Sequence, residues 1–381
     1  MRKKTESVLG ANPPQSILIV RLSAFGDIVM ASGIIPVLRR EYPRARIDWL
    51  VQGEYADLLL GTSQLGRVLV WEREKWKHLF KRGRLLDLSS RLLDFLRELC
   101  GTRYDVVLDL QGLWKSAVPA RVCRAKLRIG LDPTEGSSLA QNTICRSPSA
   151  DPWLGSEYLH LLGELGLSTR DFALGLGQTE KDREIAINLL KEKGVDKEYA
   201  VFSPFTTRPQ KHWPMENWTE LAGKIHERLG LEVVILGGPG DTEAAEELSA
   251  SCHVPVINLA GWAGLRQSMV LIREARLAVG VDTGLTHVGS MSPVPSVALF
   301  GATRPYLQTG RQDSVVLYDG IDCSPCRRRP DCSGQHYCMR DLDPQRVFQA
   351  AADLLAESPD YRSTVSPSRK LAKNNEYGTG G

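Results

Sequence analysis

The stretch Val279 to Gly301, VGVDTGLTHVGSMSPVPSVALFG, decides the fold class of this chain. An apolar run that ends at Val281 is typical of a buried strand, the segment from Leu285 to Met291 suits a helix, and a second apolar run follows two prolines. The stretch therefore predicts strand, tight turn, helix and strand in a parallel sheet. In such a sheet the turn after a strand opens toward the ligand crevice, and the first N–H groups of the next helix point into it.

The side chains in this turn suit a phosphate group. Thr283 and Thr286 supply hydroxyl donors, Gly284 lets the backbone approach a ligand, and His287 lies within one helical turn of the start. Asp282 ends the strand. The alternative is that Asp282 or Thr283 only caps the helix. This stretch alone leaves both interpretations open.

The composition is that of a globular chain long enough for two domains. It has 381 residues, of which 42% are hydrophobic and 24% charged. The formal net charge of +3 is too small to indicate nucleic acid as a partner. No apolar run reaches the length of a membrane span, and the basic N-terminus lacks the apolar segment of a signal peptide. We therefore expect a cytoplasmic protein without a nucleic-acid partner.

The same succession of strand, loop and helix occurs near the N-terminus. Ser16 to Val20 predicts a strand, and the loop Arg21 to Asp27, RLSAFGD, leads into a helix predicted over Ile28 to Glu41. Gly26 suits a tight turn. Asp27 stands where a general base could face a cleft, although a carboxylate at a helix start can also be a cap.

Two further loops follow predicted strands. After the strand Asp105 to Leu110, the polar residues Gln111, Lys115 and Ser116 can donate hydrogen bonds into a cleft, or they can belong to an exposed basic helix start. After the strand Tyr199 to Ser203, the loop carries Thr206, Thr207 and Lys211, and a lysine there can stabilise a diphosphate. Its alternative is an ordinary surface loop.

A glycine-rich turn from Gly237 to Asp241 completes the set. Its spacing differs from the dinucleotide fingerprint, yet Asp241 could bind ribose hydroxyls. Because successive loops at one sheet edge are small, polar or rich in glycine, we predict a nucleotide pocket.

The segment Arg73 to Arg84 interleaves basic residues with Trp76, Leu79 and Phe80. Such a segment can lie on an anionic membrane surface, with the aromatic rings at headgroup depth. It can equally be a solvated helix face. A second basic group, Arg121 to Arg128, makes an anionic partner of the N-terminal half plausible.

Four motifs occur in order along the chain: RLSAFGD, DLQGLWKS, TTRPQKHWP and DTGLTH. On these motifs the chain resembles the ADP-heptose:lipopolysaccharide heptosyltransferases of glycosyltransferase family nine. The resemblance implies an α/β GT-B fold, with two Rossmann-like domains whose parallel sheets face a central cleft. It also implies inverting, metal-independent transfer of L-glycero-D-manno-heptose from ADP-heptose to the lipopolysaccharide inner core, at the inner face of the inner membrane.

The resemblance assigns a role to each matching residue. Asp27 would be the general base, and Lys211 with Thr206 and Thr207 would hold the diphosphate. The donor site would include Asp241, Asp282, Thr283, Gly284, Thr286 and His287, and the acceptor side Ser23, Gly26, Gln111, Lys115 and Ser116.

The domain limits follow from changes in pattern. Residues 1–15 and 358–381 are expected to be disordered, residues 16–170 to form an acceptor domain and residues 171–357 a donor domain. The linker is placed in Gly166 to Thr179, and Pro133 to Asp151 is expected to be a loop.

Four cysteines, Cys323, Cys326, Cys332 and Cys338, lie close together in the sequence. In a cytosolic protein such grouping suits a structural zinc ion or an iron–sulfur cluster, but the spacing matches no common motif. The same four residues could equally contain a disulfide pair or remain free thiols. No metal is expected in catalysis.

Several functions remain open at this stage. The DLQGLWKS and TTRPQKHWP segments favour the first heptosyltransferase, which acts on Kdo-lipid A, and we expect a monomer. The alternatives are a later heptosyltransferase, another GT-B nucleotide-sugar enzyme such as an epimerase, and a non-catalytic nucleotide-binding protein that docks on a membrane. Neither the acceptor position nor the preference for ADP-heptose over ADP-mannose follows from the residues.

Overall fold

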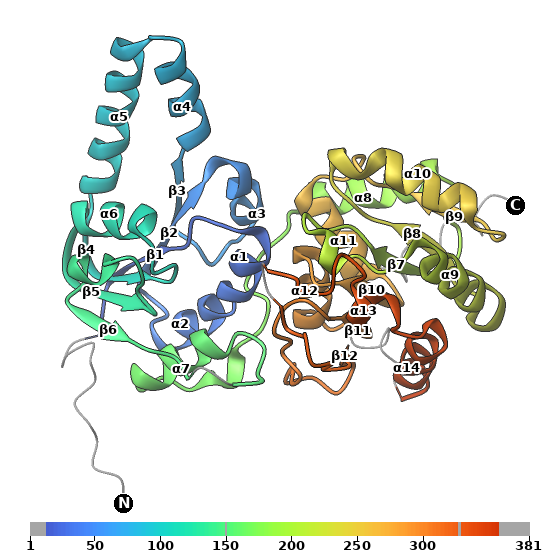
Figure 1. Ribbon diagram of the computed structural model, residues 1–381. Coiled ribbons are helices and arrows are strands. Elements are labelled where there is room, and N and C mark those ends of the chain that lie inside the picture. Colours follow the sequence, from blue (N-terminus) through green and yellow to red (C-terminus); the bar gives the residue numbers. More distant parts are fainter. Residues whose placement is uncertain (1–12, 149–150, 327–328, 358–381) are drawn as a thin grey trace, which may run out of the picture.

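The computed structural model describes residues 13–148, 151–326 and 329–357. Within them lie two six-stranded sheets, all of whose strand pairs are parallel, with helices on both faces (Figure 1). The predicted α/β class with two parallel sheets is confirmed. Disorder is predicted for residues 1–15 and 358–381, of which residues 1–12 and 358–381 lie outside the described residues. Residues 13–15 are described, and the N–H of Gln15 donates to Asp105 at 2.8 Å.

The first sheet has the strand order β3-β2-β1-β4-β5-β6. Its strands are β1 (Ser16–Val20), β2 (Arg46–Gln52), β3 (Arg67–Trp71), β4 (Arg103–Asp109), β5 (Arg124–Leu131) and β6 (Thr143–Cys145). Its helices are α1 (Phe25–Ala31), α2 (Ile34–Glu41), α3 (Ala56–Leu60), α4 (Arg73–Lys81), α5 (Leu85–Cys100), α6 (Trp114–Val122) and α7 (Ser156–Glu164).

The second sheet has the order β12-β11-β10-β7-β8-β9. Its strands are β7 (Tyr199–Ser203), β8 (Glu232–Ile235), β9 (Val256–Asn258), β10 (Leu277–Val281), β11 (Ser296–Leu299) and β12 (Ser314–Leu317). Its helices are α8 (Glu180–Glu192), α9 (Met215–Leu229), α10 (Thr242–Ser251), α11 (Leu265–Glu274), α12 (Gly284–Met291), α13 (Tyr337–Arg340) and α14 (Pro344–Glu357).

Both sheets reverse their strand order at equivalent places, between β1 and β4 and between β7 and β10. At such a switch point the loops after the two central strands diverge to opposite faces and leave a crevice at the carboxyl ends of the strands. The four motif loops follow these four strands. The fold therefore places all four motifs at the two crevices.

The central strands β1 and β10 are almost entirely buried. In β10 every residue from Leu277 to Val281 is buried, and in β1 Ile17 to Val20 are buried. Helices on both faces of a parallel sheet require apolar side chains at consecutive positions, and this is why both strands are continuous apolar runs in the sequence.

Three features differ from the sequence-based expectations. The helix expected over residues 28–41 is divided into α1 and α2 at Ser32 and Gly33, where the Phe172 ring lies so close that a Cβ on Gly33 would stand 2.5 Å from it. The expected loop at residues 133–151 contains β6, which pairs with β5. The strands β5 and β12 are additions that the sequence patterns do not predict.

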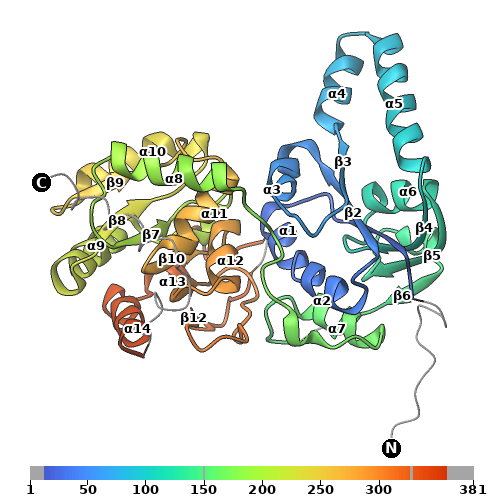
Figure 2. The same cartoon turned by 180° about the vertical axis from the view of Figure 1, so that it is seen from behind.

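The two halves touch on several sides (Figures 1 and 2). Backbone hydrogen bonds join Leu154 to the carbonyl of Gln308 at 2.8 Å and Gln308 to the carbonyl of Pro152 at 3.0 Å. Arg266 of α11 lies 3.0 Å from the Asp57 carboxylate of α3. The carboxyl edges of both sheets thus border one shared space.

The first six strands end at residue 145 and the next begin at residue 199, so the predicted domain limit at residue 170 falls between the sheets. The exact limits stay a prediction. None of the helices in the described part of the chain is long and apolar enough to cross a membrane.

Candidate active site

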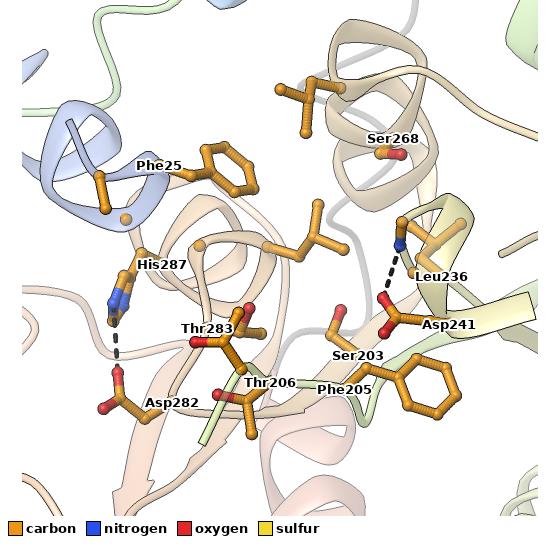
Figure 3. Close-up of a pocket in the computed structure, with 18 of the residues that line it drawn as sticks. Phe25, Ser203, Phe205, Thr206, Leu236, Asp241, Ser268, Asp282, Thr283 and His287 are labelled. Carbon is orange, nitrogen blue, oxygen red and sulfur yellow. Dashed lines mark hydrogen bonds and ion pairs between the residues drawn. The ribbon is translucent and has the colours of Figure 1, made fainter. Parts of the chain in front are cut away.

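A cavity of about 770 Å³ lies between the two halves. One wall is the loop before α1 with the start of that helix, and the other is formed by the loops after β7, β8, β9 and β10 (Figure 3). Of the predicted residues, those that line it are Gly26, Asp27, Thr206, Thr207, Lys211, Asp241, Asp282, Thr283, Gly284 and His287. Residues from distant motifs therefore meet in one space.

Asp27 caps α1 and also faces the cavity. Its Oδ2 accepts a hydrogen bond from the Ala24 N–H at 3.0 Å and lies 2.8 Å from a guanidinium nitrogen of Arg21. Arg21 in turn donates to the carbonyl of Leu110, which ties the loop after β1 to the loop after β4. These contacts hold the carboxylate through Oδ2, and Oδ1 can accept a proton. Capping and a position at the cavity are therefore both realised.

Asp282 is the centre of an ion-pair network. Its Oδ2 lies 2.5 Å from Lys211 Nζ and accepts a hydrogen bond from the Thr303 hydroxyl, while Oδ1 lies 3.4 Å from His287 Nε2 (Figure 3). Burial alone would raise the pKa of Asp282, but the hydrogen bond and charge of His287 and the charge of Lys211 outweigh it and hold that pKa well below its usual range. The Asp282 carboxylate thus joins three side chains that come from different segments of the second half.

His287 is held on both ring nitrogens. Nδ1 lies 2.8 Å from the Tyr306 hydroxyl, which donates to the Ser290 hydroxyl at 3.2 Å. Because a carboxylate only accepts, the ring nitrogen that faces Asp282 carries a proton. Burial raises the pKa of Tyr306, so this hydroxyl stays neutral. The network fixes the ring at the wall of the cavity.

The start of α12 lies at the cavity and can stabilise an anion there. Its N-cap, Thr283, makes no side-chain cap hydrogen bond, and Thr283 and Gly284 line the cavity. The first N–H groups of this helix lie at the cavity wall, where a negative group is stabilised. Thr286 is placed differently: it is buried, and its hydroxyl donates to the carbonyl of Val281 at 2.6 Å.

The loop after β8 carries Asp241 into the cavity. Its Oδ2 accepts a hydrogen bond from the Gly238 N–H at 2.7 Å, which closes the glycine-rich turn (Figure 3). Phe205 of the loop after β7 packs against this turn, since a Cβ on Gly237 would lie 2.8 Å from its ring. The remaining carboxylate oxygen of Asp241 can accept hydrogen bonds from a ligand.

The predicted acceptor residues of the loop after β4 lie behind the cavity wall. Lys115 donates to the Ser23 hydroxyl at 2.7 Å, and Gln111 donates to the Ser23 carbonyl at 3.2 Å and accepts from the Leu22 N–H at 3.0 Å. Ser116 bonds the backbone of its own helix start. Burial and the charges of nearby arginines lower the pKa of Lys115. Lys115 and Gln111 therefore hold the loop that carries Asp27.

Sequence reasoning missed several residues of the site. Arg21, Thr303 and Tyr306 support the predicted side chains, and Tyr55 and Ser268 line the cavity. Arg21 is the first residue of the quoted motif, which is a signal in itself. Tyr306 and Thr303 lie in an irregular segment whose sequence carries no such signal.

The four clustered cysteines are free thiols in the structure, so a disulfide pair is not realised. Within the described residues, no group of three or more histidine, cysteine, aspartate or glutamate side chains is arranged to hold a metal ion. Burial, followed by the neighbouring thiols, raises the pKa of Cys338 to about 11. A zinc or iron–sulfur site is therefore not formed by these side chains as they are placed.

Comparison with known proteins identifies the family of this chain. The family described as Glycosyltransferase family 9 (heptosyltransferase) matches residues 92–337. Lipopolysaccharide heptosyltransferase 1 of Pseudomonas aeruginosa is 28% identical over 369 residues, covering 89% of this chain and 98% of the relative.

Two solved structures share the fold. A glycosyl transferase of family 9 from Veillonella parvula superimposes with a TM-score of 0.78 at 21% identity, covering 90% of this chain and 98% of its own. A heptosyltransferase of Escherichia coli, solved with ADP-2-deoxy-2-fluoro heptose, gives a TM-score of 0.63 at 24% identity. The superposition covers 89% of this chain and 99% of the other. The architecture is therefore that of GT-B-type heptosyltransferases.

Proposed function

This chain belongs to glycosyltransferase family 9, the heptosyltransferases, and on that premise we propose that it transfers a heptose from ADP-heptose to the Kdo-lipid A inner core of lipopolysaccharide. The observation that carries the proposal is that Asp27, from the first half of the chain, lines the same cavity as Lys211 and the start of α12, from the second half. A base and an anion site supplied to one cavity by two halves of the chain suit a direct displacement.

The donor side follows from the second half of the chain. Lys211 and the N-terminus of α12 supply positive charge for the diphosphate, and Thr206 and Thr207 add hydroxyl donors. Asp241 is assigned to the ribose. A relative of the same fold was solved with an ADP-heptose analogue, which favours this donor.

The chemistry is a single displacement. The acceptor hydroxyl oxygen attacks the anomeric carbon while the bond from that carbon to the diphosphate oxygen breaks, and the hydroxyl proton passes to Oδ1 of Asp27. Attack from the side opposite the leaving group inverts the anomeric centre. Negative charge that grows on the leaving ADP is stabilised by Lys211 and the helix N-terminus, so the proposed step needs no metal ion.

The acceptor, location and assembly complete the proposal. The similarity to a heptosyltransferase 1 favours Kdo-lipid A as the acceptor. A lipid-anchored acceptor places the enzyme at the cytoplasmic face of the inner membrane, bound peripherally and acting as a monomer. We assign residues 16–170 to the acceptor and residues 171–357 to the donor.

The test is a transfer assay from ADP-heptose to heptose-free Kdo-lipid A in the presence of EDTA. Asp27→Asn should lower turnover by about 10²- to 10⁴-fold, because the proton then has no acceptor, with little change in ADP affinity measured by calorimetry. Asp94→Asn, at an exposed carboxylate of α5 remote from the cavity, is the matched control and should keep full turnover.

Different outcomes redirect the assignment. Transfer by the wild type only to an acceptor that already carries heptose would indicate a later heptosyltransferase. Loss of transfer in EDTA would contradict the metal-independent step. Release of no ADP with any acceptor would contradict the donor, and full turnover in Asp27→Asn would contradict the base.

A further inference from the structure

Helices α4 and α5 form a hairpin that projects beyond the rest of the first domain (Figures 1 and 2). The two helices pack through Trp76 and Phe95, whose ring centroids are 5.2 Å apart, and Trp76 also lies 6.3 Å from Trp71 at the end of β3. The sixteen residues of α5 make it about 24 Å long. The hairpin is thus a packed, elongated arm rather than a loose loop.

The tip of this arm, residues 80–86 with the sequence FKRGRLL, exposes large apolar side chains. Leu86 is 87% exposed, Phe80 66% and Leu85 57%. Three exposed cations, Lys81, Arg82 and Arg84, lie among them. Isolated apolar residues on a surface are ordinary, but three grouped at the end of a projection indicate a surface that binds something.

The apolar surface continues along α5. Leu93 lies seven residues after Leu86, and Leu96 lies eleven after Leu85, so all four share one side of the helix, and all four are exposed. Another side carries Phe95 toward Trp76. Helix α5 therefore has two apolar sides, of which only one is covered by the described residues.

The exposed apolar surface of α5 continues through α6 toward the acceptor side of the enzyme. Trp114, Val118 and Val122 are exposed and four residues apart, and the Cys100 thiol at the end of α5 donates to the Val122 carbonyl. Lys115, which holds Ser23 beside the Asp27 loop, follows Trp114 directly. The exposed apolar surface thus runs from the arm to the acceptor-side loop.

The charge of the arm selects among apolar partners. The arm, residues 73–100, carries eight lysine or arginine side chains and four carboxylates, and one of these carboxylates, Asp87, pairs with Arg84 at 2.6 Å. Apolar side chains flanked by cations match the boundary of an anionic bilayer, where rings and leucines enter the acyl region and cations contact lipid phosphates. A protein interface would need no such excess of positive charge.

We propose that the α4–α5 arm docks the enzyme on an anionic lipid bilayer, with Phe80, Leu85 and Leu86 inserted and Lys81 and Arg82 on the phosphates. The inference deepens the proposed function, since a lipid-anchored acceptor is what makes docking useful. The match to the family begins at residue 92, so the tip lies outside it.

The test is flotation of the full chain with vesicles of phosphatidylethanolamine and phosphatidylglycerol, without any sugar substrate. The wild type should float with these vesicles, bind phosphatidylcholine vesicles far less, and dissociate as salt is raised. The double variant Leu85→Ser/Leu86→Ser should bind these vesicles about tenfold more weakly than the wild type. Ile185→Glu, at an exposed apolar position of α8, is the matched control and should bind like the wild type.

Activity separates this inference from the proposed function. The double variant should keep wild-type kcat/KM with a deacylated, water-soluble acceptor and lose it with the acceptor embedded in vesicles. Vesicle binding is measured without heptosyl transfer. A wild type without transferase activity would therefore contradict the proposed function, while its vesicle binding would still test the membrane-docking proposal. The membrane-docking proposal is overturned if the wild type does not bind vesicles, or if the double variant binds them as well as the wild type. Self-association of the wild type that the double variant loses would instead identify a protein interface.

Discussion

The ring of Phe25, in the first turn of α1, lies against Gly284, the first residue of α12, so that a Cβ on Gly284 would stand 2.2 Å from Cδ1 of the ring. The neighbouring pair is similar, because a Cβ on Gly26 would stand 2.7 Å from Cδ2 of His287. The two halves of the enzyme thus meet through positions that have no room for a side chain. Their relative position at the site depends on two glycines.

Gly284→Ala should therefore disturb the site more than the fold. The added methyl must push the Phe25 ring or separate α1 from α12, and a displacement of about 1 Å between base and donor lowers kcat/KM by up to about 10²-fold. Steady-state kinetics and thermal unfolding check this. Gly163→Ala, at a helical glycine with open space around it, should leave kcat/KM unchanged and should not lower the unfolding temperature.

A double-mutant cycle with Phe25→Ala tests the mechanism of this effect. If the ring is the obstacle, Gly284→Ala should add little to Phe25→Ala alone. Full additivity of the two losses would place the effect of the methyl elsewhere.

Asp282→Asn should destabilise the chain at neutral pH. Asp282 and Lys211 are both mostly buried, and removal of one charge leaves its partner without compensation, which costs about 3–5 kcal/mol of unfolding free energy. Urea unfolding measures it. Asp282→Asn/Lys211→Met removes both charges and should recover part of the loss, whereas a double variant less stable than the single would contradict the pairing.

The same pair predicts a pH dependence of stability. The pKa of Asp282 is lowered in the folded state, so below the unfolded value of about 3.9 the folded chain binds fewer protons than the unfolded one. The stabilisation from Asp282 is present in full above that value and is lost as the pH falls through it toward the folded pKa. Between pH 5 and pH 3 the wild type should lose more unfolding free energy than Asp282→Asn, and equal losses would contradict this.

Tyr306→Phe tests the support of His287. Without the hydroxyl, Nδ1 of His287 and the Ser290 hydroxyl lose a buried partner, at a cost of about 1–3 kcal/mol in unfolding free energy. Tyr306 is a positioning residue, so the nitrogen NMR signals of the His287 ring should also change. Unchanged ring signals with the same loss of stability would indicate a packing role alone.

Alkylation reports on the buried thiols. Burial raises the pKa of Cys123, Cys145 and Cys338 to about 11 each, so at pH 8 roughly one thiol in a thousand is ionised. Iodoacetamide followed by mass spectrometry should label these three slowly in the folded chain and at least about tenfold faster in urea. Rapid labelling of Cys338 in the native chain would contradict its placement.

The sequence alone predicts those parts of the fold that depend on a pattern of neighbouring residues. The strands β1, β7 and β10 are continuous apolar runs because helices cover both faces of each sheet, and the motif loops directly follow them. In contrast, β5 alternates Arg124, Lys126 and Arg128 with small or apolar residues near the sheet edge, and such a strand resembles a basic loop.

The sequence predicts the polar residues of the site but not their supports. Asp27, Lys211, Asp282 and His287 each sit in a motif with a local pattern. The contact of Tyr306 with His287 joins residues nineteen positions apart through folding, and no local pattern encodes it. The capping and ligand interpretations of Asp27 cannot be separated by sequence because the residue both caps α1 and faces the cavity.

The two sheets have the same strand order, and this bears on how enzymes of this architecture can evolve. Each half presents the loops after its first and fourth strands at its own crevice, one half carrying the proposed base and the other the proposed anion site. Recombination in the segment between the sheets would therefore join an acceptor half to a foreign donor half without altering either crevice. An exchange of halves can in this way produce an enzyme that forms a different glycosidic linkage. The close contacts at Gly26 and Gly284, where α1 meets α12, would then have to adapt to the new partner half.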